Sequence, residues 1–183
     1  MATPWKAVLV VCVLGVLVCA GSVAMAASAA EIDREVDAAL KKLYDSEPGA
    51  RVLASKAKGI LVFPSVVKAG FLVGGQYDEG ALHKAGKTVG YYNLVAASYG
   101  LQAGVQSFGY AMFFMTDAAL NYFEKSAGFE IGSGPSIVVV DEGMAKTLTT
   151  TTAQSDIYAF FFGQQGLMGG LGLQGSKITK IKP

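Results

Sequence analysis

The fold is decided by residues 57–75, which read AKGILVFPSVVKAGFLVGG. The apolar run Ile60–Phe63 predicts a buried β-strand, because it is short, rich in branched side chains and bounded by glycine and proline. Pro64 predicts the end of that strand, since proline has no backbone N–H to donate. Gly70 predicts the start of a second strand.

Positive side chains surround this apolar stretch. Lys58 and Lys68 stand on either side of the first predicted strand and its turn, and residues 63–75 contain no acidic side chain. Residues 48–90 carry six basic against two acidic residues. Such a cluster is either a solvated face or a place where an anion binds, and the sequence leaves both interpretations open.

The N-terminus has the pattern of a secretory signal peptide. No charge occurs between Lys6 and Glu31, residues 7–19 are apolar, and Ala24-Met25-Ala26 matches an A-x-A cleavage site. We therefore expect export, with cleavage after Ala26.

The predicted domain organisation follows from this leader. Residues 1–26 are the signal, and residues 27–47 form an N-terminal helix that belongs to one globular domain with residues 48–183. Two alternatives stay open. One is an uncleaved anchor, because the uncharged stretch is long enough to span a bilayer. The other is a lipoprotein at Cys19, although a valine precedes that cysteine.

Composition narrows the function. Both cysteines and the only tryptophan lie within the predicted signal, so the exported chain would have no disulfide. Removing Lys6 from the 15 basic residues would balance the 14 acidic ones. This balance argues against a nucleic-acid-binding protein, which would need a basic excess.

Three helices are expected. Ser28 and Glu31 have the spacing of a capping box, and the apolar positions that follow lie on one helix face; they are Ile32, Val36, Leu40 and Leu43. Pro48 opens a shorter helix through Ala57, which Gly59 would end. Thr116 caps a third helix that ends near Gly128.

The remaining segments predict strands. Turn signals occur at Asp78-Glu79-Gly80 and Ala85-Gly86-Lys87, and strands are expected over residues 91–98, 101–115, 137–140, 157–162 and 167–175. Residues 137–140 should be buried on both faces. In residues 101–115, bulky side chains alternate with small ones. The fold class is therefore α+β, with a curved, mostly antiparallel sheet.

Catalytic, cofactor and metal sites find no support. His83, the only histidine, is predicted to lie in a hairpin as an exposed strand residue, and no nucleophile elbow accompanies it. The acid pairs Asp78-Glu79 and Asp141-Glu142 fit turns better than metal sites. Residues 170–175 match G-x-G-x-x-G, but too little chain follows for a dinucleotide-binding unit. We expect no enzyme.

Lipid binding fits the pattern better. The candidate contacts for a phosphate headgroup are Arg51, Lys56, Lys58 and Lys68. Two apolar features have two interpretations each. Residues 160–162, three phenylalanines, are either core or partly turned outward, and the first helix either packs on the sheet or lies in a membrane interface.

Three separated blocks resemble the SYLF domain family. The first block contributes Lys58, Gly59, Phe63, Pro64, Lys68, Gly70, Gly74 and Gly75, the second Gly100, Gln102, Gly104 and Gln106, and the third Gly166, Leu167, Gly170, Leu173 and Gly175. The resemblance implies a phospholipid-binding domain and, for some fungal members, actin binding. A Trp-Ser-x-Pro segment is usual before the second block. Residues 89–92 read VGYY instead, so no ligand contact is inferred from that tryptophan.

The sequence thus predicts a non-enzymatic, exported protein of the bacterial cell envelope that binds acidic phospholipid at a membrane surface or in a groove. Actin is an unexpected partner in that compartment. The alternative is an envelope interaction or structural module that binds a protein partner through its smooth glycine faces and edge strands.

Overall fold

The computed structural model describes residues 27–70, 73–99, 104–132, 134–140, 148, 153–166 and 175–183. Its centre is one strongly curled sheet with the strand order β5-β8-β3-β2-β1-β4-β7-β6. The strands are β1 Gly59–Gly70, β2 Val73–Lys84, β3 Lys87–Tyr99, β4 Gly104–Phe114, β5 Phe129–Glu130, β6 Ile137–Val139, β7 Ile157–Gly166 and β8 Lys177–Ile181. Neighbouring strands are antiparallel except for β6 and β7. The predicted α+β class with a curved, mostly antiparallel sheet is confirmed.

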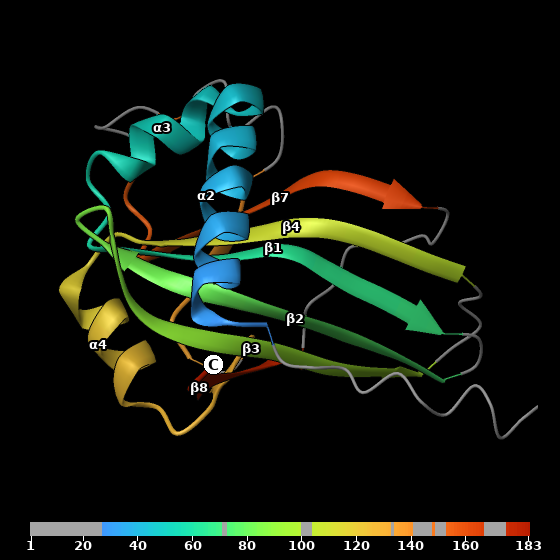
Figure 1. Cartoon of the computed structure of the whole chain (residues 1–183). Helices are drawn as coiled ribbons and strands as arrows, with labels where there is room; N and C mark the ends of the chain where they lie inside the picture. Colours follow the sequence, from blue (N-terminus) through green and yellow to red (C-terminus); the bar gives the residue numbers. More distant parts are fainter. Residues whose placement is uncertain are drawn as a thin grey trace, which may run out of the picture.

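Helix α2, Ala29–Ser46, lies across the outer face of the sheet and covers one end of it (Figure 1). It begins at the predicted cap, where the Ser28 hydroxyl accepts a hydrogen bond from the Glu31 N–H. Its buried residues include the four predicted from helical periodicity. They pack against Val62, Phe113 and Phe160 of the sheet. The first helix therefore packs on the sheet rather than standing apart from it.

The inner face of the curled sheet holds a second core. The bulky face of β4 predicted by alternation points into it: Phe108, Tyr110, Met112 and Phe114 are buried there. Helix α4, Asp117–Lys125, closes the core with Ala119, Leu120 and Phe123, and the Thr116 hydroxyl caps it as predicted. The small residues of β4 face α2 instead.

Strand β1 does not stop at Pro64. It runs from Gly59 to Gly70 as one element, with a register shift between Phe63 and Val66 in its pairing with β4. A β-bulge takes the proline out of the hydrogen-bonding ladder, which is how a central strand can contain it. The prediction of two strands was wrong because the bulge depends on the neighbouring strands.

The segment Asp78-Glu79-Gly80 is not a turn but the middle of β2. The Asp78 carboxylate accepts a hydrogen bond from the Ser65 N–H at 2.7 Å, inside the bulge of β1. The second turn signal was right. Ala85 and Gly86 have φ values of 48° and 74° and connect β2 to β3, as two-residue hairpins require.

Two further predictions were wrong, and two fall outside the described residues. Helix α3, Pro48–Ala54, ends before Ala57, and Gly59 opens β1 instead of capping the helix. Strand β6 is an edge strand with Val139 half exposed, so it is not buried on both faces. The predicted strand over residues 167–175 lies, but for its last residue, outside the described residues, as does the signal over residues 1–26.

Strands β5 and β8 had no counterpart in the sequence analysis. β8 is short and carries exposed lysines, so its pattern does not stand out. Within the described part of the chain, no helix combines the length and apolar character needed to cross a membrane.

Candidate functional site

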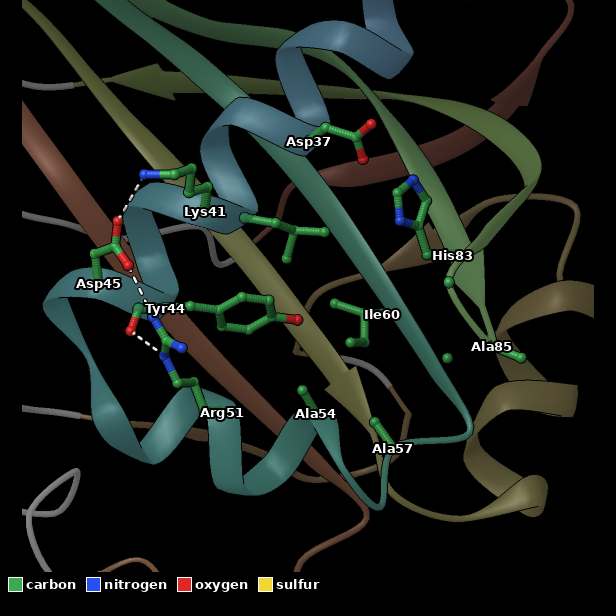
Figure 2. Close-up of a pocket in the computed structure, with 13 residues that line it drawn as sticks. Asp37, Lys41, Tyr44, Asp45, Arg51, Ala54, Ala57, Ile60, His83 and Ala85 are labelled. Carbon is green, nitrogen blue, oxygen red and sulfur yellow. Dashed lines mark hydrogen bonds and ion pairs between the residues drawn. The ribbon is translucent and has the colours of Figure 1, made fainter.

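A pocket of about 680 Å³ lies where α2, α3, the start of β1 and the β2–β3 hairpin meet. Its size is in the range of ligand-binding pockets, roughly 300–1,000 Å³. Figure 2 shows the residues around it. The lining consists of Asp37, Leu40, Lys41, Tyr44, Asp45, Arg51, Ala54, Ala57, Gly59, Ile60, His83, Ala85 and Gly86.

The middle of the pocket is apolar. Leu40 and Tyr44 follow one another by a helical turn on α2, Ala54 comes from α3, and Ile60 comes from β1. The Tyr44 ring lies between the two polar sides of the pocket (Figure 2). Burial raises the pKa of the Tyr44 hydroxyl, and the nearby Arg51 guanidinium opposes that rise. The hydroxyl is therefore neutral at physiological pH and can act as a hydrogen-bond donor.

One side of the pocket carries two cations held by one carboxylate. Arg51 Nη2 lies 2.8 Å and Lys41 Nζ 3.1 Å from the Asp45 oxygens. Arg51 Nε also donates to the Tyr44 carbonyl oxygen at 2.7 Å, and its guanidinium lies 6.0 Å from the Tyr44 ring centroid. The hydrogen bond and charge of Lys41, with the Arg51 charge, lower the pKa of Asp45. Because these pairs are exposed, they cost little to exchange for another anion.

The opposite side carries His83 and Asp37 (Figure 2). His83 was predicted to be exposed, but its residue is only 8% accessible because α2 covers the end of β2. Its Nε2 lies 3.1 Å from Thr88 Oγ1, and the Thr88 hydroxyl donates to Asp33 at 2.8 Å. The single hydroxyl proton is thus committed to Asp33, so His83 Nε2 must be the donor to Thr88.

That direction is opposite to a catalytic triad, in which the hydroxyl donates to the imidazole. Tyr91 adds a second hydrogen bond to Asp33, from its hydroxyl at 3.0 Å. The network therefore ties α2 to the β2–β3 hairpin and fixes the His83 ring at the pocket wall. It does not activate Thr88 as a nucleophile.

The structure brings three of the four predicted headgroup contacts together. Arg51 lines the pocket, and Lys56 and Lys58 flank Ala57, which also lines it. All three side chains are exposed. Lys58 Nζ lies 3.6 Å from the Asp117 carboxylate at the start of α4, in another exposed pair.

Lys68 lies elsewhere. It is ten residues along β1 from Lys58, which at about 3.3 Å per residue separates the two by roughly 30 Å. Its residue is 5% accessible, and its register partners on both sides are Gln76 and Gln106, also buried. Side chains directly opposite one another share a face, so the three form a polar row on the inner face of the sheet. The expectation of one positive rim containing all four residues is therefore revised.

The three consecutive phenylalanines are core residues. Phe160 and Phe162 lie under α2, and Phe161 faces the inner core, where its ring meets those of Phe108 and Tyr110 at centroid distances of 5.5 and 5.0 Å. The structure thus excludes them as an exposed lipid contact.

Apolar side chains are exposed at the other end of the sheet, beyond α2. Val67, Tyr77 and Val95 are register partners across three strands, and each is close to half exposed. Val73 and Val105 are each 62% exposed. Outward-facing apolar residues in neighbouring strands form a patch of the kind that often binds a partner.

Within the described ranges, no three His, Cys, Asp or Glu side chains are grouped in a way that could hold a metal ion. Lys41, Tyr44 and His83, which complete the pocket, were missed by sequence reasoning. Tyr44 could have been placed on the helix face of Leu40, four residues earlier, and Lys41 stands at the same spacing from Asp37. His83 could not, because its place depends on pairing with Ile60 of β1.

A curled sheet with a pocket beneath a covering helix is an arrangement that suits a binding domain. The family comparison agrees with this class. Residues 95–182 match the Ysc84 family, described as "Las17-binding protein actin regulator", which is the SYLF domain family. Residues 95–182 are therefore similar to the SYLF family that the sequence motifs predicted, and that family consists of binding domains. A search of curated proteins finds no match.

Proposed function

We propose that this protein binds acidic phospholipid without chemical conversion, with the phosphate headgroup at Arg51, Lys56 and Lys58 and apolar atoms of the lipid in the adjoining pocket. One observation carries the proposal: a pocket with an apolar middle opens beside exposed cations from α3 and the start of β1. An amphiphile needs that juxtaposition of apolar wall and positive rim.

The magnitudes are sufficient for reversible binding. Each lysine or arginine near an anionic membrane contributes about 1 kcal/mol, so three contribute about 3 kcal/mol. Each buried methylene adds about 0.8 kcal/mol. Against this, the exposed pairs of Arg51 with Asp45 and of Lys58 with Asp117 are each worth at most about 1 kcal/mol.

The proposed site excludes Lys68, since one headgroup cannot reach both ends of β1. The proposed place of action is the bacterial cell envelope, after export, as the uncharged leader and its A-x-A triplet suggest.

Charge reversal tests the site. Lys56→Glu combined with Lys58→Glu should weaken co-sedimentation with vesicles of phosphatidylcholine containing phosphatidylglycerol by about 30-fold or more, the equivalent of about 2 kcal/mol. Arg51 is left unchanged because it also holds the Tyr44 carbonyl oxygen.

The matched control is Lys125→Glu with Lys182→Glu, which makes the same charge change at exposed positions away from the pocket. Its binding should stay close to that of the wild type at moderate salt. Equal loss in both double variants would mean that only net charge matters, and the site would be abandoned.

A second candidate is a protein-interaction module. The exposed patch of Val67, Tyr77 and Val95 favours it, and so does the family description, which names a protein partner. A stoichiometric complex isolated without lipid, and lost in Tyr77→Ser with Val67→Ser, would favour this candidate over lipid binding.

A further inference from the structure

The backbone nitrogen of Ala27 donates a hydrogen bond to Glu79 Oε2 at 3.1 Å. The contact joins the residue that precedes the N-cap of α2 to the middle of β2, 52 positions later in the chain. Ala27 also packs against the core beneath α2, and the next residue, Ser28, caps that helix. Ala27 is thus held by a hydrogen bond and by apolar packing at the start of α2.

The surroundings of this nitrogen are acidic. Glu79 Oε1 accepts a hydrogen bond from the Tyr77 hydroxyl at 2.6 Å. The charged groups that act on the neighbouring Asp78 carboxyl are Glu35, from α2, and Glu79 itself, both negative. Burial, with a smaller contribution from these two charges, raises the pKa of Asp78 to about 7, against hydrogen bonds from the Ser65 and Glu79 N–H groups. A positive charge at this place would be stabilised.

The sequence supplies such a charge at the same atom. Ala24-Met25-Ala26 predicts cleavage of the bond between Ala26 and Ala27. Hydrolysis by a signal peptidase adds one water: Ala26 leaves with a new carboxylate, and the Ala27 nitrogen becomes a primary amine. An α-amino group has a pKa of about 7.7–8.0, so it takes up a proton at neutral pH.

We propose that Glu79 binds the processed N-terminus. Cleavage would convert the hydrogen bond from the Ala27 amide to the Glu79 carboxylate into an ion pair. Sequence and structure point independently to the same residue, one through the cleavage triplet and the other through the contact with Glu79. The inference does not depend on lipid binding.

The ion pair also offsets an unfavourable electrostatic interaction that cleavage would create. A positive charge next to the N-terminus of α2 would be repelled by the helix dipole. The Glu79 carboxylate offsets that repulsion, and charge-assisted hydrogen bonds are about twice as strong as neutral ones. Processing should therefore fasten the start of α2 to β2.

The test compares two forms of the chain that begins at Ala27: one with a free amine and one acetylated at that nitrogen. Acetylation keeps the N–H but removes the charge. At pH 6.5 the free form should unfold about 2–4 °C higher. Glu79→Gln should abolish the difference, and so should raising the pH above about 9, where the amine is neutral.

Glu124→Gln, which breaks a salt bridge with Lys84, serves as the control and should lower both forms equally. Equal unfolding temperatures of the two wild-type forms at pH 6.5 would overturn the proposal. So would a difference that survives in Glu79→Gln, or an intact mass of the exported protein that places its first residue elsewhere than Ala27.

Discussion

At the scale of single residues, Asp78 has the most consequential environment. Its carboxylate accepts hydrogen bonds from the Ser65 N–H in the bulge of β1 and from the N–H of Glu79. Ionisation of this carboxyl nevertheless costs free energy, because burial removes it from water. Burial is the main cause that raises its pKa, to about 7, and the charges of Glu35 and Glu79 add to it.

This raised pKa predicts a pH dependence of stability. The unfolded carboxyl titrates near 3.9, so between about pH 4 and pH 7 the folded state binds more protons than the unfolded state. The contribution of Asp78 is then fully present below pH 4 and is lost as the pH rises to 7. The Asp78→Asn variant has no carboxyl group at this position, so it cannot lose this contribution to stability as the pH rises.

Urea unfolding of the acetylated chain at pH 4.5 and 7.5 checks this expectation. Over that interval the free energy of unfolding of the wild type should fall relative to that of Asp78→Asn by at least about 1 kcal/mol. Parallel behaviour of the two proteins would show that the Asp78 carboxyl titrates as an ordinary one.

At the scale of elements, apolar periodicity and capping residues predicted parts of the helices and strands correctly, whereas the course of a strand past its proline was not predicted. The apolar face of α2, the caps at Ser28 and Thr116 and the alternation in β4 were confirmed, because each depends on residues within a few positions. The course of β1 through Pro64 was not predicted. A bulge is decided by the strands on both sides, and neither partner can be read from residues 57–75.

The crossing of β1 and β2 gives a second prediction. A side chain at Gly80 would overlap the Val62 carbonyl oxygen and lie 2.8 Å from the Phe63 ring. Gly80→Ala should therefore destabilise the protein by about 1–3 kcal/mol, as overpacked sites do.

The control is Gly75→Ala in the same strand, where the nearest atom to the new Cβ, the Ala96 carbonyl oxygen, would be 3.6 Å away. It should change stability by no more than about 0.5 kcal/mol. Thermal unfolding of the two variants compares them directly, and similar losses would argue against the close packing at Gly80.

At the scale of the whole molecule, the sheet has two unlike ends. Helices α2 and α3 lie over one end (Figure 1), where the pocket and the exposed cations also lie. The other end bears the buried polar row of Lys68 and the exposed patch. Arg51, Lys56 and Lys58 lie at or beside the same pocket, because they are close in the chain. The sequence analysis also grouped Lys68 with them, because Pro64 hid the continuation of β1 through the bulge as one long strand.

The pocket itself was not predicted, for a related reason. Its walls come from four elements, and His83 reaches it only through the pairing of β1 with β2. Pairing over such distances leaves no local pattern. The binding class could still be predicted, because three short motifs in the right order resemble the SYLF family, whose model matches residues 95–182.

The most direct test of the proposed function is a nuclear magnetic resonance titration with a soluble short-chain phosphatidylglycerol, with the matching phosphatidylcholine as control. We expect saturable shifts of the backbone signals of Leu40, Tyr44 and Ile60, together with those of Lys56 and Lys58, and much weaker ones with phosphatidylcholine. Shifts confined to the opposite end of the sheet, around Val67 and Tyr77, or no saturable shift at all, would contradict the proposal.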